Sequence, residues 1–599
     1  MGANAAWNGL GYLNPIAWFL EWSDVILAFI CVLGAVRTKE LSSHLHGYIL
    51  IGVSLVFSAI SYVPSVAAPM IHGAINQSID PYDFLILALP VLFLPLLIQH
   101  DLKNRHNAKI APFLFFISVI VALGYLLYMF CLIAPQFPTD ESVFDMYAAH
   151  LFLFGKNPYN PALMSSAFNF YNFQFHAFDP ITPLTTGGYV NELTYPALSF
   201  LVFIPAVILH LKASVVMLPI LLAPIFIVWY RAWSRKQWIM SSYALLPFIS
   251  LLLYTYQGAS ADTDALWASL LMLSYLSLPR NKSSGILFGL SLSVKQLPFI
   301  AAPFFLYFIY REYGTMKATK WLALAVAAFF IVNGYSIFEN PSYWFSSMVA
   351  NEFAPLIGIG FGVTQIAFTG IVHITNLFFT LVMLNLLLVF FLLYVFRYRK
   401  LKYALFIFPI PIFLFNYRLF PQYLYYWILI SLLPMLDTMK PEITSDEAFK
   451  APHFKANNFA PKLRGLAVLF VTLAIIGSLA FGIHEGVQNS PGHFTVNSAI
   501  PASYNSSGYI NKIYVEISYQ GSSDNLSHVY FRIFQDTAIV NGNMYLWLST
   551  NNTQFMPGET YNLTIVPQYQ NYSLNPAISS TIVAYYGNIQ GEYYLQGLN

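Results

Sequence analysis

Three carboxylates occur within six residues of a chain that is otherwise poor in charge. Asp140 and Glu141 directly follow an apolar run at 111–134, and Asp145 lies about one helical turn further on. Only 9% of the residues are charged, so such a cluster stands out. A carboxylate held near a hydroxyl group can act as a general base and remove its proton. A solvated acidic loop would have the same composition, and charge alone leaves both interpretations open.

A second acidic group lies before two other apolar runs. Asp262 and Asp264 precede and begin the run at 264–279, and Glu192 comes shortly before the Tyr195-Pro196 pair. Carboxylates in these positions could take part in chemistry. They could equally cap the starts of helices, where Asp and Glu are favoured.

Two cations lie where few are expected. Lys295 falls inside the apolar stretch 285–310, and Arg418 is the basic residue of a short turn at 416–423. An unpaired Lys at membrane depth is costly, so it should face a cavity or an anion, and phosphate suits both cations. A Lys that only reaches the outer interface along its apolar stem is the simpler alternative.

The elements that must position these residues are transmembrane helices. Of the 599 residues, 57% are hydrophobic and 18% aromatic, which is more apolar surface than a soluble fold can bury. We expect a polytopic α-helical membrane protein with about 11–13 transmembrane helices and a C-terminal all-β, sandwich-like domain. The expected spans are 15–36, 47–69, 83–99, 111–134, 239–256, 264–279, 320–338, 373–396, 402–416, 423–436 and 464–484.

The distribution of Lys and Arg predicts the orientation. Basic loops belong in the cytoplasm, which places the N-terminus, the loop 135–194 and the tail after 485 outside a multi-pass cell membrane. This assignment requires that 195–230 make one net crossing, with part of it re-entrant or interfacial. It also makes 285–310 a hairpin that dips toward the outer face, with residues 294–298 near its tip. Such interrupted segments are tolerated where they face protein or a wet cavity.

Composition changes again near the C-terminus. Alternating apolar and polar residues, split by turn residues, predict strands over 485–599. We therefore divide the chain into an N-terminal transmembrane extension at 1–110, a transmembrane domain at 111–484 that carries the candidate site residues, and an extracytoplasmic β-rich domain at 485–599. No nucleotide-binding or zinc-protease motif occurs, and nothing in the sequence indicates nucleic acid as a partner.

Four motifs, in order, resemble the GT-C superfamily of glycosyltransferases, which use sugars carried on polyprenyl phosphates. The first is Asp140-Glu141 followed by 155–159 (GKNPY). The others are 193–198 (LTYPAL), 258–266 (GASADTDAL) and 285–298 (GILFGLSLSVKQLP). In the family's pattern a second proline stands where this chain has Ala197. The resemblance covers roughly residues 111–430.

The resemblance implies a function and roles for the candidate residues. It implies transfer of a sugar, a hexose such as mannose, from a polyprenyl or dolichyl phosphate to a glycan, lipid or protein acceptor at the outer face. Asp140 and Glu141 would form the catalytic acid pair, with Asp145 as the alternative, while Lys295 and Arg418 would hold the donor phosphate. Asp262, Asp264 and Glu192 would be acidic residues of the cavity.

Several points stay open at the level of sequence. Family members differ in their use of metals, and Asp140, Glu141 and Asp264 could together bind a divalent cation, although no motif requires one. A transporter or flippase of lipid-linked sugars would also use broken helices and buried charges. A non-catalytic membrane scaffold of a surface layer is the third possibility.

Overall fold

The computed structural model describes residues 109–133, 139–171, 189–243, 261–278, 282–353, 376–419 and 421–438 of the helical part. In the C-terminal part it describes residues 492–521, 529–535, 545–551, 554–567, 573–577, 579–586 and 589–596, and scattered positions lie between these ranges. Nearly all of the predicted N-terminal extension at 1–110 lies outside the described residues, as does most of the predicted span 239–256.

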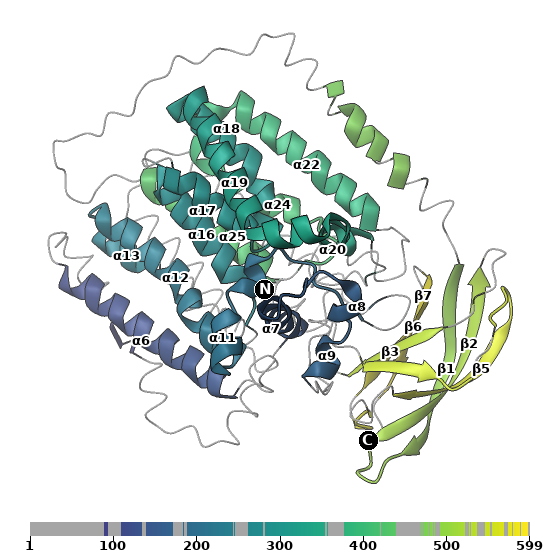
Figure 1. Ribbon diagram of the computed structural model, residues 1–599. Helices are drawn as coiled ribbons and strands as arrows, with labels where there is room; N and C mark the ends of the chain where they lie inside the picture. The colour runs from purple at the N-terminus through teal and green to yellow at the C-terminus, as the bar shows by residue number, and fades with distance from the viewer. Residues whose placement is uncertain are drawn as a thin grey trace.

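The helical part contains long helices interrupted by short ones (Figure 1). Its elements are α6 (Ile110–Ile133), α7 (Asp140–Leu153), α8 (Pro161–Met164), α9 (Ala167–Phe170), α10 (Leu198–Leu201), α11 (Ile204–Leu209), α12 (Ala213–Ser234), α13 (Trp238–Tyr243), α16 (Asp264–Leu276), α17 (Lys282–Leu292), η2 (Leu297–Ala301), α18 (Ala302–Tyr313), α19 (Thr315–Glu339), α20 (Pro341–Phe353), α22 (Asn376–Phe396), α23 (Tyr398–Leu401), η3 (Lys402–Ala404), α24 (Pro409–Phe413) and α25 (Pro421–Thr438).

Three helices in the described part are long and apolar enough to cross a membrane. They are α12, α19 and α22, with 22, 25 and 21 residues. A helix needs about 20 apolar residues to span the hydrocarbon core. The predicted membrane class is therefore supported by these helices, while the full count of 11–13 spans stays a prediction.

The two interrupted segments are broken where the charge pattern requires. Residues 195–230 form α10 and α11 and most of α12, and the left-handed backbone of His210 (φ 54°) ends α11. Residues 285–310 form a helical hairpin of α17 and α18, joined by residues 293–296 and the 3₁₀ turn η2. Lys295 thus lies in the turn of the hairpin, where we expected it.

The predicted span 402–416 is wrong as a continuous helix. The segment consists of η3, a series of turns and the five-residue α24, and its side chains at 405–408 are fully buried. Two prolines, Pro409 and Pro411, interrupt the backbone hydrogen bonding that a long helix needs. An apolar run of this length can be buried in protein as easily as in lipid, and hydropathy does not separate the two cases.

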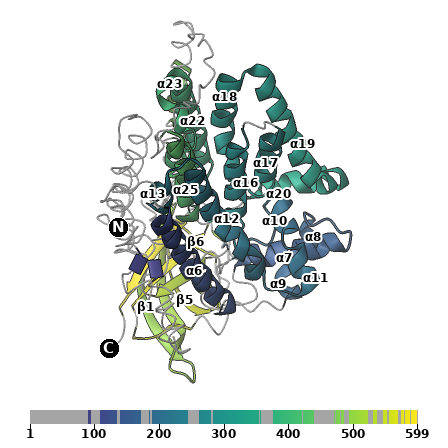
Figure 2. The same cartoon turned by 90° about the vertical axis from the view of Figure 1, so that its left-hand side faces the viewer.

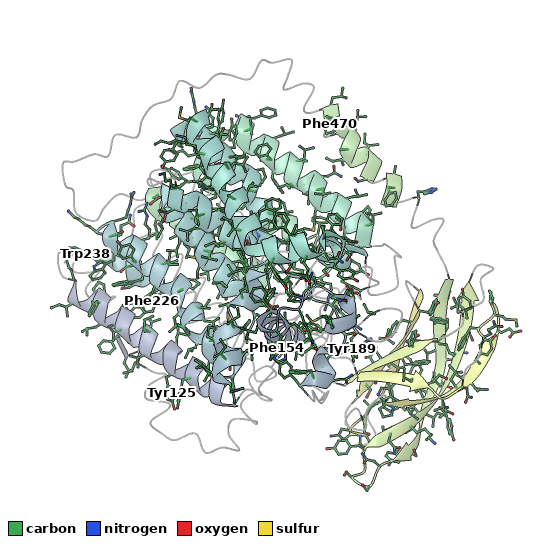
Figure 3. All side chains as sticks on the ribbon, in the orientation of Figure 1. Tyr125, Phe154, Tyr189, Phe226, Trp238 and Phe470 are labelled. Carbon is green, nitrogen blue, oxygen red and sulfur yellow. The ribbon has the colours of Figure 1, made fainter. Side chains whose placement is uncertain are left out.

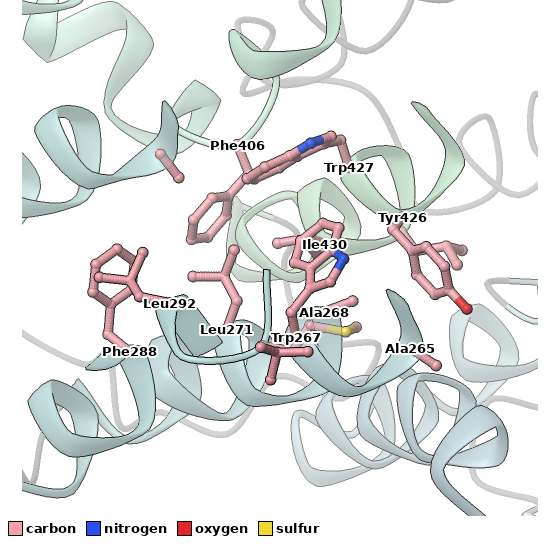
Figure 4. Packing of buried hydrophobic residues seen from close by; sticks show 14 of the residues in the cluster. Ala265, Trp267, Ala268, Leu271, Phe288, Leu292, Phe406, Tyr426, Trp427 and Ile430 are labelled. Carbon is pink, nitrogen blue, oxygen red and sulfur yellow. The ribbon is translucent and has the colours of Figure 1, made fainter. Parts of the chain in front are cut away.

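Close packing of aromatic side chains fixes the centre of the helical part. Figure 4 shows Trp267 of α16 beside Trp427 of α25, with ring centroids 5.2 Å apart. Phe226 of α12 makes an edge-to-face contact with Phe116 of α6 at 5.5 Å, and its position is labelled in Figure 3. The first contact holds α16, the helix that begins at Asp264, against α25, and the second holds α12 against α6.

Two glycines let α17 approach α19. A Cβ atom at Gly289 would lie 2.2 Å from the backbone oxygen of Ala325, and one at Gly285 would lie 2.6 Å from that of Trp321. Small residues four positions apart are a common device for close helix contact in membranes. Because α17 leads directly into the turn at Lys295, this contact also fixes the position of that turn relative to α19.

The C-terminal part is one antiparallel sheet of seven strands. They are β1 (Gly492–Tyr504), β2 (Ile510–Gly521), β3 (Tyr530–Gln535), β4 (Tyr545–Ser549), β5 (Thr560–Pro567), β6 (Ser580–Tyr586) and β7 (Ile589–Leu595), in the order β1-β2-β5-β4-β3-β6-β7. The predicted all-β tail is confirmed. Figures 1 and 2 show the sheet at the same end of the helical part as α7 and α9.

The sheet nearly closes into a barrel, which corrects the expectation of a sandwich. At Gly591 of β7 a Cβ atom would lie 2.0 Å from the backbone oxygen of Phe494 of β1, so the two outermost strands meet. Its interior holds apolar side chains such as Ile513, Phe531 and Trp547. Alternation along strands predicts which face is buried but not which strands pair. Here the pairs β2–β5 and β3–β6, which are not adjacent in sequence, join the strands into one sheet.

Candidate active site

The first helix of the loop after α6 begins at the acidic pair. Thr139 caps α7 through a capping box, in which its hydroxyl accepts from the Ser142 N–H and the Ser142 hydroxyl accepts from the Thr139 N–H, both at 3.1 Å. Asp140 and Glu141 occupy the first helical turn, where the helix dipole favours negative charge. The local sequence therefore fixes both carboxylates at a defined point.

Lys295 pairs with two carboxylates from different segments. Its Nζ donates to Glu141 Oε2 at 2.9 Å and lies 3.2 Å from Asp264 Oδ1. The Lys295 side chain is 2% exposed, Asp264 1% and Glu141 10%. We call these three residues the Lys295 cluster. Its ammonium is already compensated by protein groups, whereas the sequence led us to expect it to face a phosphate.

Neutral donors complete the hydrogen bonding of this cluster. Glu141 Oε1 accepts from the backbone N–H of Thr263 at 3.0 Å and from its hydroxyl at 2.8 Å. Asp264 Oδ1 accepts from the indole of Trp267 at 2.7 Å. Sequence reasoning missed Thr263 and Trp267 as site residues. The position of Thr263 between two aspartates was a signal that could have found it.

Asp140, the chain neighbour of Glu141, lies within the electrostatic influence of the second predicted cation, Arg418. Asp140 is partly exposed, and burial raises its pKa above the usual value. A hydrogen bond with Thr182 and the positive charge of Arg418 act in the opposite direction on that pKa. Each of the two cations predicted from the sequence therefore interacts with one of two successive carboxylates.

Asp145 lies deeper in the same region. It is fully buried, and the Ser199 hydroxyl donates to its Oδ1 at 2.8 Å. Burial, and then the negative charge of Glu141, raise the pKa of Asp145 well above the usual value. Asp262 is close enough to act on it in the same direction. The structure thus brings Asp145 and Asp262 to the site but leaves Asp145 out of solvent.

Glu192 is the one predicted site residue that stays apart. It is half-buried and makes no ion pair within the described ranges. Glu192 lies just before the segment 194–199, which does contact the site, so its position in the sequence alone could not exclude it as a site residue.

The segment 194–199 is tied to the turn that carries Lys295. Leu198 N–H donates to the Ser293 carbonyl at 2.8 Å, and the Gln296 amide donates to the Thr194 carbonyl at 2.6 Å. The ring of Tyr195, which sequence reasoning gave no role, lies 4.7 Å below the Lys295 ammonium. These bonds hold the Lys295 turn against the start of α10.

The GKNPY motif reaches the same place. Tyr159 donates its hydroxyl proton to the carbonyl of Tyr195 at 2.8 Å. With Glu141, Asp264 and Lys295, the four sequence motifs therefore meet at one site, although up to 154 residues separate the bonded side chains.

The carboxylates are not arranged as a metal site. Within the part of the chain that the structure describes, no group of three or more His, Cys, Asp or Glu residues could hold a metal ion. Glu141 and Asp264 instead share the Lys295 ammonium. The possible divalent cation at Asp140, Glu141 and Asp264 gains no support from this geometry.

Fold and site define a helix-rich protein with three long apolar helices, a buried ionic cluster at one end and a C-terminal antiparallel sheet. No protein-family model, curated protein or solved structure matches the chain. Its function must therefore be argued from these residues themselves.

Proposed function

We propose that this chain is an integral membrane glycosyltransferase of GT-C-like architecture. It transfers a sugar, a hexose such as mannose, from a polyprenyl or dolichyl phosphate to a glycan, lipid or protein acceptor at the outer face of the membrane. One observation carries the proposal. The acidic start of α7 meets two cations from distant segments, Lys295 by direct contact and Arg418 through its effect on Asp140.

Asp140 is the best-placed general base. Asp140 and Glu141 are both partly exposed, but both oxygens of Glu141 are engaged by Thr263 and Lys295, and Asp145 is buried. Asp140 takes the proton of the acceptor hydroxyl while the oxygen attacks the anomeric carbon of the sugar. The bond from that carbon to the phosphate oxygen breaks, and the phosphate leaves with the electron pair.

The two cations have different parts in this reaction. Arg418 is the principal phosphate ligand, because a guanidinium can grip two phosphate oxygens at once. Lys295 is held by Glu141 and Asp264, and the positive charge of its ammonium stabilises the leaving phosphate electrostatically. Charges fixed in advance in a partly dry site are usually the largest single contribution to such catalysis.

The membrane supplies the donor. With α12, α19 and α22 across the bilayer and the C-terminal sheet outside, a lipid-linked sugar can reach the site by lateral diffusion from the outer leaflet. The membrane lipids, the lipid-linked sugar and the acceptor are then the partners of the protein. The sheet lies beside the outer end as an accessory domain.

A transfer assay in membranes tests the proposal. A panel of polyprenyl-phosphate sugars is offered to the wild-type chain and to Asp140→Asn, with and without chelator. The variant should lose about 10²–10⁴-fold in transfer rate, since a general base contributes that much, while it still binds the donor. Glu339→Gln, an exposed carboxylate at the end of α19, is the matched control and should transfer normally. Undiminished transfer by Asp140→Asn would exclude Asp140 as the base.

A transporter or flippase of lipid-linked sugar is the second candidate. The buried carboxylates of Asp145 and Asp264 favour it, because ionisable groups at membrane depth often mark proton or substrate paths. Movement of a labelled lipid-linked sugar across proteoliposomes separates the two. A flippase should move the lipid without an acceptor and should retain that activity in Asp140→Asn.

A further inference from the structure

Three carboxylates and one ammonium share the buried space between α7 and the start of α16. Glu141, Asp145 and Asp264 supply the carboxylates, and Lys295 supplies the ammonium. With all four groups ionised, this space would hold two uncompensated negative charges away from water. Burying uncompensated charge is so unfavourable that a carboxylate in this situation keeps its proton instead.

The hydrogen bonds show which carboxylate this is. Glu141 receives Lys295 on one oxygen and two donors of Thr263 on the other. Asp264 receives Lys295 and the indole of Trp267 on one oxygen.

Asp145 receives one bond, from the neutral hydroxyl of Ser199. Its second oxygen, Oδ2, is buried and has no hydrogen-bond partner among the described residues. Ionisation is therefore least supported at Asp145.

We propose that Asp145 is a neutral carboxylic acid in the working protein, and that its proton keeps the site able to accept a phosphate. Asp145 is then a positioning residue and not the base. It links α7 to α10 through Ser199, and it withholds a negative charge from the space beside Lys295.

The groups around Asp145 explain why its charge state matters. Glu141 comes from its own helix, Asp262 from the segment before α16, Tyr159 from the loop before α8, and Lys295 from the hairpin turn. Lys295 is the one cation in this set, and it already faces two carboxylates. A further negative charge at Asp145 would oppose the approach of a phosphate, which itself carries negative charge.

The consequence for binding rests on the proposed function. As the pH rises and Asp145 loses its proton, the KM for the lipid-phosphate donor should rise, while kcat should change little. Asp145→Asn, which carries no charge at any pH, should show no such alkaline rise in KM.

Infrared difference spectroscopy tests the protonation state without reference to activity. The full-length protein in detergent is compared with Asp145→Asn at neutral pH, in H₂O and in D₂O. The carbonyl stretch of a protonated carboxylic acid, recognised by its shift in D₂O, should be present in the wild type and absent in the variant. An unchanged band in Asp145→Asn would overturn the proposal, because Asp145 would then be ionised.

A second variant keeps the test decisive if Asp145→Asn does not fold. Ser199→Ala removes the one hydrogen bond to the Asp145 carboxyl, so the same carbonyl band should move to a different frequency. A band that does not move belongs to another residue, and the assignment fails. If the band behaves as expected but no donor is transferred, the proposed function fails while the neutral Asp145 stands.

Discussion

Helix α16 has a different ionic cluster at each end. Comparison of the two distinguishes charges that stabilise the fold from charges that serve function. At the start of α16, the Lys295 cluster has more carboxylates than cations and is almost completely buried. At its far end, the carboxylate of Asp437 meets two arginines. Arg231 Nε donates to it at 2.9 Å, the Tyr275 hydroxyl donates to its other oxygen at 2.8 Å, and Arg235 bonds to its backbone oxygen at 3.0 Å. We call this group the Asp437 clamp.

The two clusters differ in how completely their groups are satisfied. Both carboxylate oxygens of Asp437 accept hydrogen bonds, and its cations are partly exposed, so the clamp joins α12, α16 and α25 at little electrostatic cost. The Lys295 cluster is buried, and Oδ2 of Asp264 lacks a hydrogen-bond partner in the described part of the chain. A cluster that serves stability alone has no need of such an oxygen. The imbalance at the start of α16 is therefore the better sign of function.

The largest effect should follow loss of the ammonium. Lys295→Met leaves Glu141 and Asp264 buried without their cation, which should cost about 3–5 kcal/mol of unfolding free energy. Transfer should fall by about 10²–10³-fold, because a preorganised charge is lost from the site. Thermal unfolding in detergent and the membrane transfer assay measure the two effects. A double variant that also carries Glu141→Gln should recover part of the stability, and a fully stable Lys295→Met would contradict the pairing.

The next effect concerns the acid side of the pH–rate profile. Under the proposed mechanism transfer requires ionised Asp140, so the rate should fall as the pH drops through a pKa that burial holds above the usual value. The charge of Arg418 lowers that pKa, so Arg418→Gln should move the acid limb to higher pH. Loss of one phosphate-binding cation should also reduce kcat/KM by about 10–100-fold, the equivalent of one strong charge-assisted hydrogen bond. An acid limb at the wild-type pH would refute the pairing of Asp140 with Arg418.

Packing of α17 against α19 can be disturbed without substituting a residue of either cluster. Gly289→Val inserts side-chain atoms where a Cβ alone would lie 2.2 Å from the Ala325 oxygen. The helices α17 and α19 must separate, at a cost of about 1–3 kcal/mol. Gly124→Val on α6 is the matched control, since no atom lies within 4 Å of its added Cβ. Equal melting temperatures for the two variants would show that α17 does not need this contact.

The smallest effect should come from the clamp. Asp437→Asn keeps one acceptor oxygen but loses the charge that faces Arg231 and Arg235. We expect a loss of about 1–2 kcal/mol in unfolding free energy, the value of a charge-assisted hydrogen bond. The kcat/KM for transfer should stay at the wild-type level. A large loss of transfer in this variant would mean that the two ends of α16 are coupled, and the distinction drawn above would fail.

Sequence reasoning found the individual site residues better than their pairing. The basic loops on both sides of 285–310 predicted the hairpin, and the cost of burying a Lys predicted that Lys295 would face a cavity or an anion. That its partners are Glu141 and Asp264 could not be predicted, because 154 and 31 residues separate them along the chain, as their numbers show. For the same reason, the prediction that Lys295 binds a phosphate did not include its pairing with Glu141 and Asp264.

The fold shows a similar limit. Strand alternation predicted an all-β tail, but register and strand order depend on contacts that only the folded chain makes. Hydropathy likewise marked 402–416 as a span, although Pro409 and Pro411 divide it. Local composition determines which segments are apolar, and tertiary packing determines whether lipid or protein covers them.

The length of α16 has a geometric consequence for access to the site. Its 13 residues rise by about 20 Å, whereas the hydrocarbon core of a bilayer is about 30 Å thick. If the Asp437 end lies at the cytoplasmic interface, as the proposed orientation requires, the opposite end stops about 10 Å short of the outer interface. Under the proposed function, the Lys295 cluster would lie below the level of the lipid head groups, and a carrier lipid would have to lower its phosphate by about that distance to reach Asp140.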